Sequence, residues 1–420
     1  MIDKLGEFFY NHAEEVQQWL DSKAEGHILP FYSSADIRDS GLKAACIDLN
    51  LFPAGFNNLC DTFAIKSHKP MQAFLEERFA KRQYPYKRVL IIPEAHSRNP
   101  YYNKNLRSLK LTLESVGLTV TIASMANPGE PFPSELITYD NERVPVSVVW
   151  REEDAIVGEN NEIFDWILLN NDLSSGSIEW LGNLRQPILP PLCFGWHNRS
   201  KFNFFRFYTA MVEEMAQEFD FDPWHLYAMT DKVEDVNFTT DAGREQVASA
   251  VSKMLVSIKE KYKQWGIAQE PHVFIKNDTG TYGIGIMVVK SPEDVLNMNR
   301  KARNKMAIGK GRRPIRTVVI QEAIPTRSVA NSIVAEPVVY LIGKEIIGMF
   351  LRANLERGII DNLNASGMEF YTYCSLATNR RNGHCICNDT TQQLYCTVSK
   401  LGVLAAAREM AVACGDEIVE

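Results

Sequence analysis

Apolar residues in the first half of the chain recur at spacings that predict alternating helices and strands. One helical pattern covers residues 1–24, and a second covers residues 68–83. From residue 87 onward, the apolar runs "KRVLIIP", "LTVTIAS" and "FDWILLN" alternate with the amphipathic segment "LRSLKLTLESVG", which Gly117 is expected to end. Strands alternating with helices are typical of an α/β unit with a mostly parallel sheet, whose ligands bind beyond the carboxyl ends of the strands.

The second half of the chain predicts longer elements. Residues 239–266 form a long amphipathic pattern, whose apolar face consists of Val247, Val251, Met254, Leu255 and Ile258. Residues 271–289 predict a strand, a glycine loop and a second strand, after which Ser291 is the expected N-cap of a helix. Residues 336–354 predict two strands joined by a hairpin turn at Gly343.

Composition excludes several classes of protein. A chain of 420 residues, 45% hydrophobic and 23% charged, is ordinary for a globular protein of two or three domains. A net charge of −7 argues against nucleic-acid binding, and the most basic run, residues 310–316, is interpreted as a solvated loop. No apolar stretch reaches the roughly 18 residues of a membrane span. The acidic, amphipathic N-terminus does not resemble a signal peptide, so we expect a cytoplasmic protein.

Eight cysteines are spread along the chain, and none of them forms a Cys-x-x-Cys pair. For an acidic chain of this length we expect buried or reduced thiols rather than a disulfide framework. The sequence "HCIC" at residues 384–387 lacks a second half at metal-ligand spacing, so zinc is not expected.

Candidate chemistry begins in the stretch "CIDLNLFPAGFNNLC", residues 46–60. Asp48 and Asn50 are two residues apart, so their side chains would share one face of a strand. Pro53 and Gly55 then predict a tight loop. Carboxylate and amide oxygens at a strand end form a good site for a hard cation such as Mg²⁺.

The glycine-rich stretch "FIKNDTGTYGIGI" is the most informative part of the sequence. Lys276 ends an apolar strand, and Thr279, Gly280, Gly283 and Gly285 lie in the loop that follows. Small residues allow backbone N–H groups to close around phosphate oxygens, while the lysine supplies positive charge. The spacing fits neither GxxxxGK[ST] nor GxGxxG, and an ordinary glycine-rich hairpin remains the alternative.

Further polar residues follow later strands. The apolar run "VVIQEAI" leads into Gln321 and Glu322, and a later strand ends near Arg352. The Asn-rich stretch "DNLNASG", residues 361–367, comes next, and "GWHNRSKFNFF" upstream contributes Lys201.

This order of motifs resembles that of the ATP-grasp ligases, and the later part is especially similar to bacterial glutathione synthetase. The resemblance implies ATP and Mg²⁺ as cofactors, two lysines on the ATP phosphates, a glycine loop that covers them and a hinge that binds adenine. By this resemblance the nucleotide-binding residues are Lys201, Lys276, Thr279, Gly280, Gly283, Gly285, Gln321 and Glu322. The residues implied to act on an acyl phosphate are Lys276, Arg352, Asn362 and Asn364.

One part of the ATP-grasp pattern is missing from its usual place, because no E-x-N metal strand follows Asn364. The strand with Asp48 and Asn50 resembles the E-I-N strand of eukaryotic glutathione synthetase, where circular permutation moves the metal strand ahead of the ATP lobe. Asp48 stands where Glu is usual. Asp278 in the glycine loop is a third candidate ligand, with capping of the turn as its alternative.

The resemblance therefore implies an α/β fold of the ATP-grasp type, circularly permuted and carrying an inserted domain. Residues 1–86 would complete the ATP-grasp lobe with the metal strand. Residues 87–194 would form an inserted α/β substrate-binding domain, and residues 195–420 the ATP-grasp domain.

Over nearly all 420 residues, the chain is similar to the proteobacterial glutamate–cysteine ligase family typified by acidophilic thiobacilli. The stretches "DLNLFPAGFNNL" and "PEAHSRNPYYNKN" carry this resemblance. It implies an ATP-dependent ligase that joins the γ-carboxylate of glutamate to the amine of cysteine through an acyl phosphate, the first step of glutathione biosynthesis. Candidate substrate contacts are Asp36, Arg38, Asn57, Glu94, His96, Arg98 and Arg199. Each arginine could instead form a surface salt bridge, and Glu94 and His96 could belong to loop structure.

Two other functions remain open at this point. One is glutathione synthetase or another amino-acid ligase, since a fold does not fix its substrate. The other is a non-catalytic nucleotide-binding protein, against which both lysines and Arg352 argue. The expected partners are small molecules, glutamate and cysteine, with no nucleic acid and no membrane. The sequence leaves the oligomeric state open, with a homo-oligomer as one option.

Overall fold

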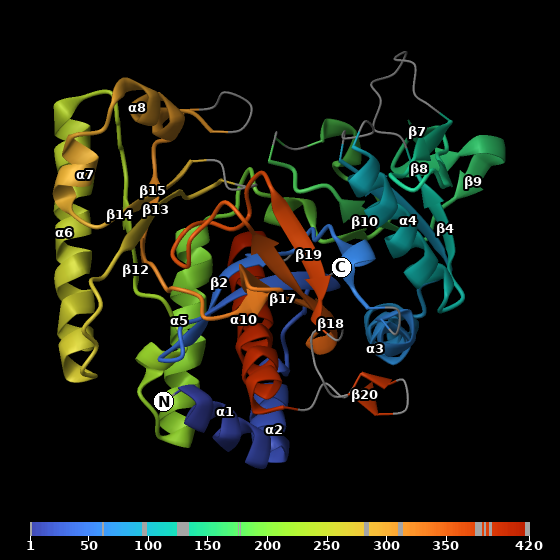
Figure 1. Ribbon diagram of the computed structural model, residues 1–420. Helices are drawn as coiled ribbons and strands as arrows, with labels where there is room; N and C mark the ends of the chain where they lie inside the picture. The colour runs from blue at the N-terminus through green and yellow to red at the C-terminus, as the bar shows by residue number, and fades with distance from the viewer. Residues whose placement is uncertain are drawn as a thin grey trace.

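The computed structural model describes residues 2–60, 63–94, 99–123, 134–174, 176, 178–280, 285–309, 314–373, 380–381, 384–385 and 389–415. These residues form a mixed α/β fold with several sheets, which confirms the predicted fold class (Figure 1). No helix in these residues is long and apolar enough to cross a membrane.

The central sheet joins strands from opposite ends of the chain. Its order is β19-β18-β17-β1-β2, and β16 pairs with β17 outside this path. The hairpin predicted at Gly343 is confirmed, because β17 and β18 are antiparallel and Gly343 adopts a φ of +53° between them. The bounds of the strands are β1 Tyr32–Asp39, β2 Ala44–Asn50, β16 Val329–Ala330, β17 Ile333–Ile342, β18 Glu345–Asn354 and β19 Met368–Thr372.

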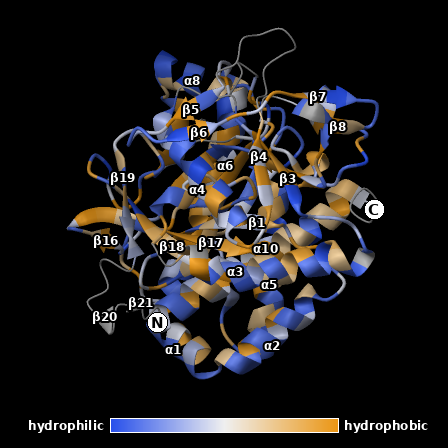
Figure 2. Ribbon diagram, turned by 90° about the vertical axis from the view of Figure 1, so that its right-hand side faces the viewer, coloured by the Kyte–Doolittle hydropathy of each residue, from blue (hydrophilic) through white to orange (hydrophobic). Residues whose placement is uncertain are grey.

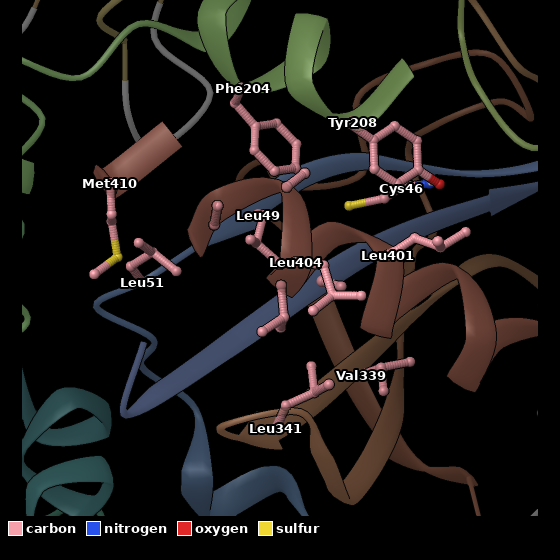
Figure 3. Close-up of a cluster of buried hydrophobic side chains, with 14 of the residues drawn as sticks. Cys46, Leu49, Leu51, Phe204, Tyr208, Val339, Leu341, Leu401, Leu404 and Met410 are labelled. Atoms are coloured by element: carbon pink, nitrogen blue, oxygen red, sulfur yellow. The ribbon is translucent and has the colours of Figure 1, made fainter. Parts of the chain in front are cut away.

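Helices cover one face of this sheet. Helix α10 (Thr390–Cys414) contacts β1, β2 and β17 on one side and α5 (Lys201–Phe219) on the other. Figure 3 shows the resulting core, in which apolar side chains of α10 meet those of the sheet and of α5. The labelled residues of this core are Cys46, Leu49, Leu51, Phe204, Tyr208, Val339, Leu341, Leu401, Leu404 and Met410.

The single helix predicted for residues 1–24 is wrong, because the chain forms two helices there. Helix α1 (Ile2–Asn11) ends before His12, and α2 (Ala13–Ala24) begins after it. His12 has φ −113° and ψ 31°, outside the α-helical region. The bend allows both helices to pack on α10. In Figure 2, α2, α3 (Phe63–Arg78) and α5 carry hydrophilic and hydrophobic residues together, as expected for helices with one face on a core.

A second sheet is parallel, as the alternating pattern after residue 87 predicted. Its order is β11-β10-β3-β4, with parallel pairing throughout. Helix α4 (Pro100–Glu114) connects β3 to β4, and Gly117 follows it with a φ of +83°. The strands are β3 Arg88–Pro93, β4 Thr119–Ile122, β10 Trp166–Asn170 and β11 Ile188–Leu189. Short antiparallel strands accompany them: β5 Glu135–Ile137, β6 Arg143–Pro145, β7 Val149–Glu152, β8 Ala155–Gly158 and β9 Glu162–Ile163.

A third sheet, of order β12-β15-β13-β14, carries the glycine loop between β13 and β14. Helix α6 (Asp241–Gln264) packs on it through the apolar face predicted from sequence. Ser291 caps α7 with a capping box, as predicted. The remaining bounds are β12 Thr230–Val233, β13 Val273–Asn277, β14 Ile286–Val289, β15 Val318–Glu322, α7 Pro292–Leu296 and α8 Arg300–Ala307.

The expectation that all cysteines are unpaired thiols is wrong for two of them. Cys193, in the short helix η5 (Leu192–Phe194), forms a disulfide with Cys414 at the end of α10. The two residues are 221 positions apart, so no local spacing reveals the pair. Cys46 is a buried free thiol.

Candidate active site

Two connected cavities lie where the central sheet meets the sheet of the glycine loop. The smaller, of about 60 Å³, is lined by charged residues of β1, β2, β13, β17 and β18. The larger, of about 940 Å³, extends from the same place toward α4 and β19. Residues common to both linings are Asp36, Asp48, Lys201, Gly280, Arg352 and Asn364.

Asp48 and Lys201 form an ion pair at this junction. Lys201 is the first residue of α5, and its Nζ donates to Asp48 Oδ1 over 2.7 Å. The ammonium group also lies 4.4 Å from the centre of the Trp196 ring, a cation–π contact. Burial pushes the pKa of Asp48 up, but the positive charges of Lys201 and Lys276 outweigh it and hold this pKa below its ordinary value. Asp48 is therefore ionised at neutral pH.

Lys276 reaches the same cavity from the end of β13. Its Nζ donates to Gln321 Oε1 over 2.7 Å and to the carbonyl oxygen of Ile47 over 3.3 Å, a contact across 229 residues of sequence. Burial lowers the pKa of Lys276 to about 8, against the attraction of Asp48. The end of the strand before the glycine loop thus reaches the strand of Asp48 through the Lys276 side chain.

Two arginines share one buried carboxylate, that of Glu336 on β17. Arg352 donates from Nε and Nη2 to Glu336 Oε1, over 2.9 and 2.5 Å. Arg38 donates from Nε to Glu336 Oε2. Arg352 Nη2 also donates to Asp36 Oδ2 over 2.5 Å, so the side chains form a continuous charged network.

The Asn-rich loop completes the smaller cavity. Asn362 and Asn364 both line it, and the two residues hold each other through Asn362 Oδ1, which accepts from the backbone N–H of Asn364 over 3.1 Å. Arg38 anchors the start of this loop, because its Nη1 and Nη2 donate to the carbonyl oxygens of Ile359 and Asp361 over 3.0 and 2.6 Å.

Both hinge side chains bind protein partners, although Glu322 Oε1 is buried with no hydrogen-bond partner among the described residues. Gln321 accepts from Lys276 and donates to Thr230 Oγ1 over 3.1 Å. Glu322 binds the buried Lys43, whose Nζ lies 2.6 Å from Glu322 Oε2. Burial lowers the pKa of Lys43 to about 8, and Glu322 opposes this shift.

The contacts of Asp278 are those of a capping residue. Its Oδ1 accepts from Ser200 Oγ over 3.0 Å and from the backbone N–H of Phe202 over 2.9 Å, at the start of α5. Asp278 is not among the described residues that line either cavity. The carboxylate therefore fixes the helix that delivers Lys201.

Arg199 lies beside the site rather than in it. Its Nε lies 3.3 Å from Glu409 Oε2, its Nη1 donates to the carbonyl oxygen of Leu49 over 2.7 Å, and it is 3% exposed. Glu94 is also internal, since its Oε1 accepts from the backbone N–H of Asp172 over 2.9 Å. Neither Arg199 nor Glu94 is among the described lining of the two cavities.

The backbone conformations of the glycine loop and of the 53–56 loop depend on their glycines. A Cβ on Gly285 would lie 2.9 Å from Ile315 Cδ1, and Gly285 has a φ of +71°, which favours glycine. Gly55 has a φ of +103°, and its N–H donates to the buried Asn105 over 2.8 Å. Asn50 lines the larger cavity, and its Oδ1 accepts from the backbone N–H of Phe52 over 2.9 Å.

The other predicted site residues fall into three groups. Asn57 lines the larger cavity, while Thr279 is exposed and lies outside both described linings. His96, Arg98 and Gly283 lie outside the described residues.

Sequence reasoning missed two buried carboxylates and a buried amide pair. Glu336 binds Arg38 and Arg352, and Glu409 binds Arg199. Asn105 donates to Asn170 Oδ1 over 3.1 Å, behind the 53–56 loop. A signal for Glu336 exists in the sequence, because it lies near Arg352 across the hairpin predicted at Gly343.

Comparison with known proteins assigns this site to a class. The model of a family described as glutamate-cysteine ligase matches residues 7–410. A crystal structure of a "putative gamma-glutamylcysteine synthetase" from Methylobacillus flagellatus KT is 34% identical, covers 98% of this chain and 96% of that one, and superposes with a TM-score of 0.87. D-alanyl-alanine synthetase A from Vibrio cholerae is 12% identical over 71% of this chain and 77% of that one, with a TM-score of 0.33, too low to carry an argument. No curated protein matched.

A mixed α/β scaffold with convergent lysines and arginines, matched over nearly its whole length by a ligase family, is a ligase. The chain belongs to the glutamate–cysteine ligase family. Its reaction forms γ-glutamylcysteine from glutamate and cysteine, a step of glutathione biosynthesis, which confirms the predicted function.

Proposed function

We propose that this ligase activates the γ-carboxylate of glutamate with ATP and that the acyl phosphate forms where the two cavities meet. The observation that carries the proposal is the shared lining, in which Lys201, Arg352 and Asn364 face both cavities. A phosphoryl group that passes from one ligand to another must lie within reach of both, and the shared lining provides such a place.

The smaller cavity suits the phosphates of the nucleotide. Lys201, Lys276 and Gly280 line it together, and two ammonium groups beside a glycine loop match the charge and size of a phosphate chain. The larger cavity suits the two amino acids, since amides and a carboxylate, including Asn57, Asn105 and Asp172, line it and can bind ammonium and carboxylate groups.

The ATP-grasp architecture in permuted form belongs to this proposal. Its support is the place of the first two strands. β1 pairs with β17 and β2 pairs with β1, which brings the carbonyl oxygen of Ile47 to within 3.3 Å of the Lys276 ammonium group. In this arrangement residues 1–86 and 195–420 build one site, and residues 87–194 supply the far wall of the larger cavity. Gln321 orients Lys276, and Glu322 binds Lys43, so both hinge side chains act in support of the nucleotide site.

The donor set at the junction fits Mg²⁺. The ionised carboxylate of Asp48 lines both cavities, Asn50 lies two residues further on the same strand, and Asp36 lies directly opposite Asp48 in the strand register. In the described chain no group of three or more His, Cys, Asp or Glu side chains is arranged to hold a metal by itself. Mg²⁺ ordinarily takes few protein ligands and relies on phosphate oxygens, and when bound it would neutralise phosphate charge. Asp48 and Asn50 would hold it, and the capping contacts of Asp278 favour the alternative role for that residue.

The reaction then runs in two steps. The γ-carboxylate of glutamate attacks the γ-phosphorus of ATP and ADP leaves, after which the cysteine amine attacks the acyl carbon and phosphate leaves. Lys201, Lys276 and Arg352 stabilise the negative charge that develops on the transferred group. The amide groups of Asn362 and Asn364 can donate further hydrogen bonds to it.

Of the arginines, Arg352 is the best placed to contact a ligand. Its Nη1 has no hydrogen-bond partner among the described residues, and its side chain lines both cavities. Arg38 uses all of its nitrogen atoms on protein partners, and Arg199 is held by Glu409. We therefore assign Arg38 and Arg199 to the support of the site.

Phosphate release with a panel of amino acids tests the reaction. Release that requires ATP, glutamate and cysteine together is expected. Equal release with γ-glutamylcysteine and glycine in their place would instead indicate a glutathione synthetase. An Arg352→Lys variant should lower kcat with little change in KM, since a point charge cannot replace the guanidinium fork. The enzyme would act where ATP and both amino acids are available, which places it in the cytoplasm.

A further inference from the structure

The charged network of the smaller cavity is organised around Glu336, which lines this cavity but is only 1% exposed. Arg352 lies opposite Glu336 in the β17–β18 register. On the other side, Asp36 lies opposite Val338 in the β1–β17 register, so continuing this antiparallel register places Arg38 opposite Glu336. Arginine, glutamate and arginine thus form one row across three neighbouring strands.

Each oxygen of Glu336 serves a different arginine. Oε1 accepts from two nitrogen atoms of Arg352, Nε and Nη2, and this pair of bonds fixes the plane of the guanidinium group. Oε2 accepts from Arg38. A guanidinium held at Nε and Nη2 can turn only one remaining edge, that of Nη1, toward a ligand.

The same carboxylate also links Arg352 to the Asn-rich loop. Arg38 passes from Glu336 Oε2 to the carbonyl oxygens of Ile359 and Asp361, directly before Asn362. The chain of contacts from Arg352 through Glu336 and Arg38 therefore ends at the loop whose amides line the cavity.

Charge favours an ionised Glu336. Burial alone would raise the pKa of its carboxyl group, but the charges of Arg38 and Arg352 outweigh burial and lower it. Burial raises the pKa of Asp36, and the nearby charges of Glu336 and Asp48 add to this against the attraction of Arg352. Asp36 is thus less readily ionised than Glu336. Glu336 is therefore the carboxylate that determines the orientation of Arg352.

We propose that Glu336 is a positioning residue for ligation: its carboxylate orients Arg352 toward the transferred phosphoryl group and, through Arg38, sets the loop that carries Asn362 and Asn364. This inference rests on the proposed role of Arg352. Because a fixed guanidinium needs no rearrangement when negative charge develops, the effect belongs to the chemical step rather than to substrate binding.

The test is Glu336→Gln, which keeps the size of the side chain and removes its charge. An amide presents an NH₂ group in place of one carboxylate oxygen, so one of the two arginines would face a donor instead of an acceptor. The expected result is a kcat about 10- to 100-fold lower, as for other partners that orient active groups, with KM values for ATP, glutamate and cysteine within about twofold of wild type. Glu336→Asp keeps the charge on a shorter stem and should give an intermediate kcat.

Glu345→Gln is the matched control, because Glu345 is exposed at the start of the same hairpin. It should leave kcat unchanged. Nucleotide affinity by calorimetry should change little in Glu336→Gln, since Lys201 and Lys276 hydrogen-bond to other groups and the charge of Glu336 is a minor influence on Lys276. If the Gln variant does not fold, the Asp variant decides: a lowered kcat with wild-type nucleotide affinity supports the proposal, and a wild-type kcat overturns it.

A double variant separates this inference from the function it rests on. If Glu336 acts through Arg352, then Glu336→Gln should cost much less in an Arg352→Lys background than in wild type. The positioning role alone would be overturned if the effects of the two substitutions on kcat were fully additive. It would also be overturned if Glu336→Gln had a wild-type kcat while Arg352→Lys was impaired. An unimpaired Arg352→Lys would instead remove the proposed role of Arg352.

Discussion

At the scale of single residues, the two lysines of the smaller cavity differ in their partners. Lys201 is neutralised by Asp48, whereas within the described chain Lys276 bonds only to neutral oxygen atoms, those of Ile47 and Gln321. A buried cation without a counterion is costly, and the pKa of Lys276 falls to about 8 as a result. In the proposed site, a phosphate of ATP would be the counterion of this ammonium group.

Lys276→Ala should therefore weaken ATP binding while the fold survives. The loss of a hydrogen bond to a charged group, about 1.5–3 kcal/mol, corresponds to an affinity about 10- to 100-fold lower by calorimetry. Lys232→Ala is the control, because Lys232 is exposed on β12 of the same sheet. Equal affinity in wild type and Lys276→Ala would reject the assignment.

The pH dependence of binding follows from the same residue. In the free enzyme Lys276 loses its proton as the pH rises through about 8, so ATP affinity should be highest below that pH and fall above it. A phosphate would hold the proton in place, so binding near pH 8 should take up protons. Titrations between about pH 7 and 9.5 in buffers of different ionisation enthalpy measure this uptake. The Lys276→Ala variant should lack it.

Asp48→Asn should abolish ligation and leave the fold intact. The change removes the anion that would hold Mg²⁺ and leaves Lys201 unpaired, but the side chain lies at the cavity rather than in the core. Titration of Mn²⁺ in the presence of ATP should show weaker metal binding than in Asp231→Asn, a variant at an exposed position of β12. Wild-type metal affinity in Asp48→Asn would exclude it as a ligand.

At the scale of elements, sequence patterns predicted the structure correctly where an element depends on residues nearby in the sequence. The hairpin at Gly343, the apolar face of α6 and the strands around the glycine loop depend on neighbours in sequence, and all were predicted correctly. The break at His12 was not predictable from periodicity, because it serves contacts with α10, a distant element. Residues 401–407 of α10 are apolar or glycine without interruption, so this stretch has no amphipathic pattern that indicates its place at the centre.

The candidate site shows the same limit. Asp48, Lys201, Lys276 and Arg352, which the resemblance singled out, line one cavity, whereas Glu336 in the same lining was not predicted. Counting back from the turn at Gly343 pairs Arg352 with Ala335, because Ile342 lies opposite Glu345. An irregularity in the register after Tyr340 shifts the pairing by one residue and brings Glu336 opposite Arg352 instead. Nothing in the sequence alone marks this bulge.

The packing of α10 can be tested with one pair of variants. Leu404 is 1% exposed between the sheet and α5, so Leu404→Ala should lower the free energy of unfolding by about 2–5 kcal/mol. Val412, on the same helix, is 71% exposed, and Val412→Ala should change it by less than about 0.5 kcal/mol. Denaturant unfolding measures both. A similar small loss in the two variants would contradict the central place of α10.

At the scale of the whole molecule, the disulfide joins the end of the parallel α/β segment to the end of α10. Cys193 and Cys414 are 221 positions apart, and the chain between them includes α5, the glycine-loop sheet and the β17–β18 hairpin. A cross-link over so long a loop acts mainly by restricting the unfolded chain.

Cys414→Ser should lower the free energy of unfolding by about 2–5 kcal/mol, the usual range for loss of a native disulfide. Reduction of the wild-type protein should have the same effect, and reduction of the variant should add nothing. Denaturant unfolding with and without a thiol reductant measures all four cases. A further loss when the variant is reduced would show that the effect comes from another site.

The pairing of β1 with β17 has a consequence for the time course of synthesis. Arg38 leaves the ribosome 298 residues before its partner Glu336. At translation rates of about 5–20 residues per second, the β1–β2 hairpin waits for about 15–60 s without a neighbour for one of its edges. On the side that α10 later covers, the two strands carry the apolar residues Ala35, Ile37, Ala44, Cys46 and Leu49 and the polar Asp39, and α10 follows the other described elements in the chain. The nascent chain therefore exposes an unpaired strand edge through most of its synthesis. A chaperone that shields this edge would raise the yield of active enzyme more than a chaperone that acts on the finished chain.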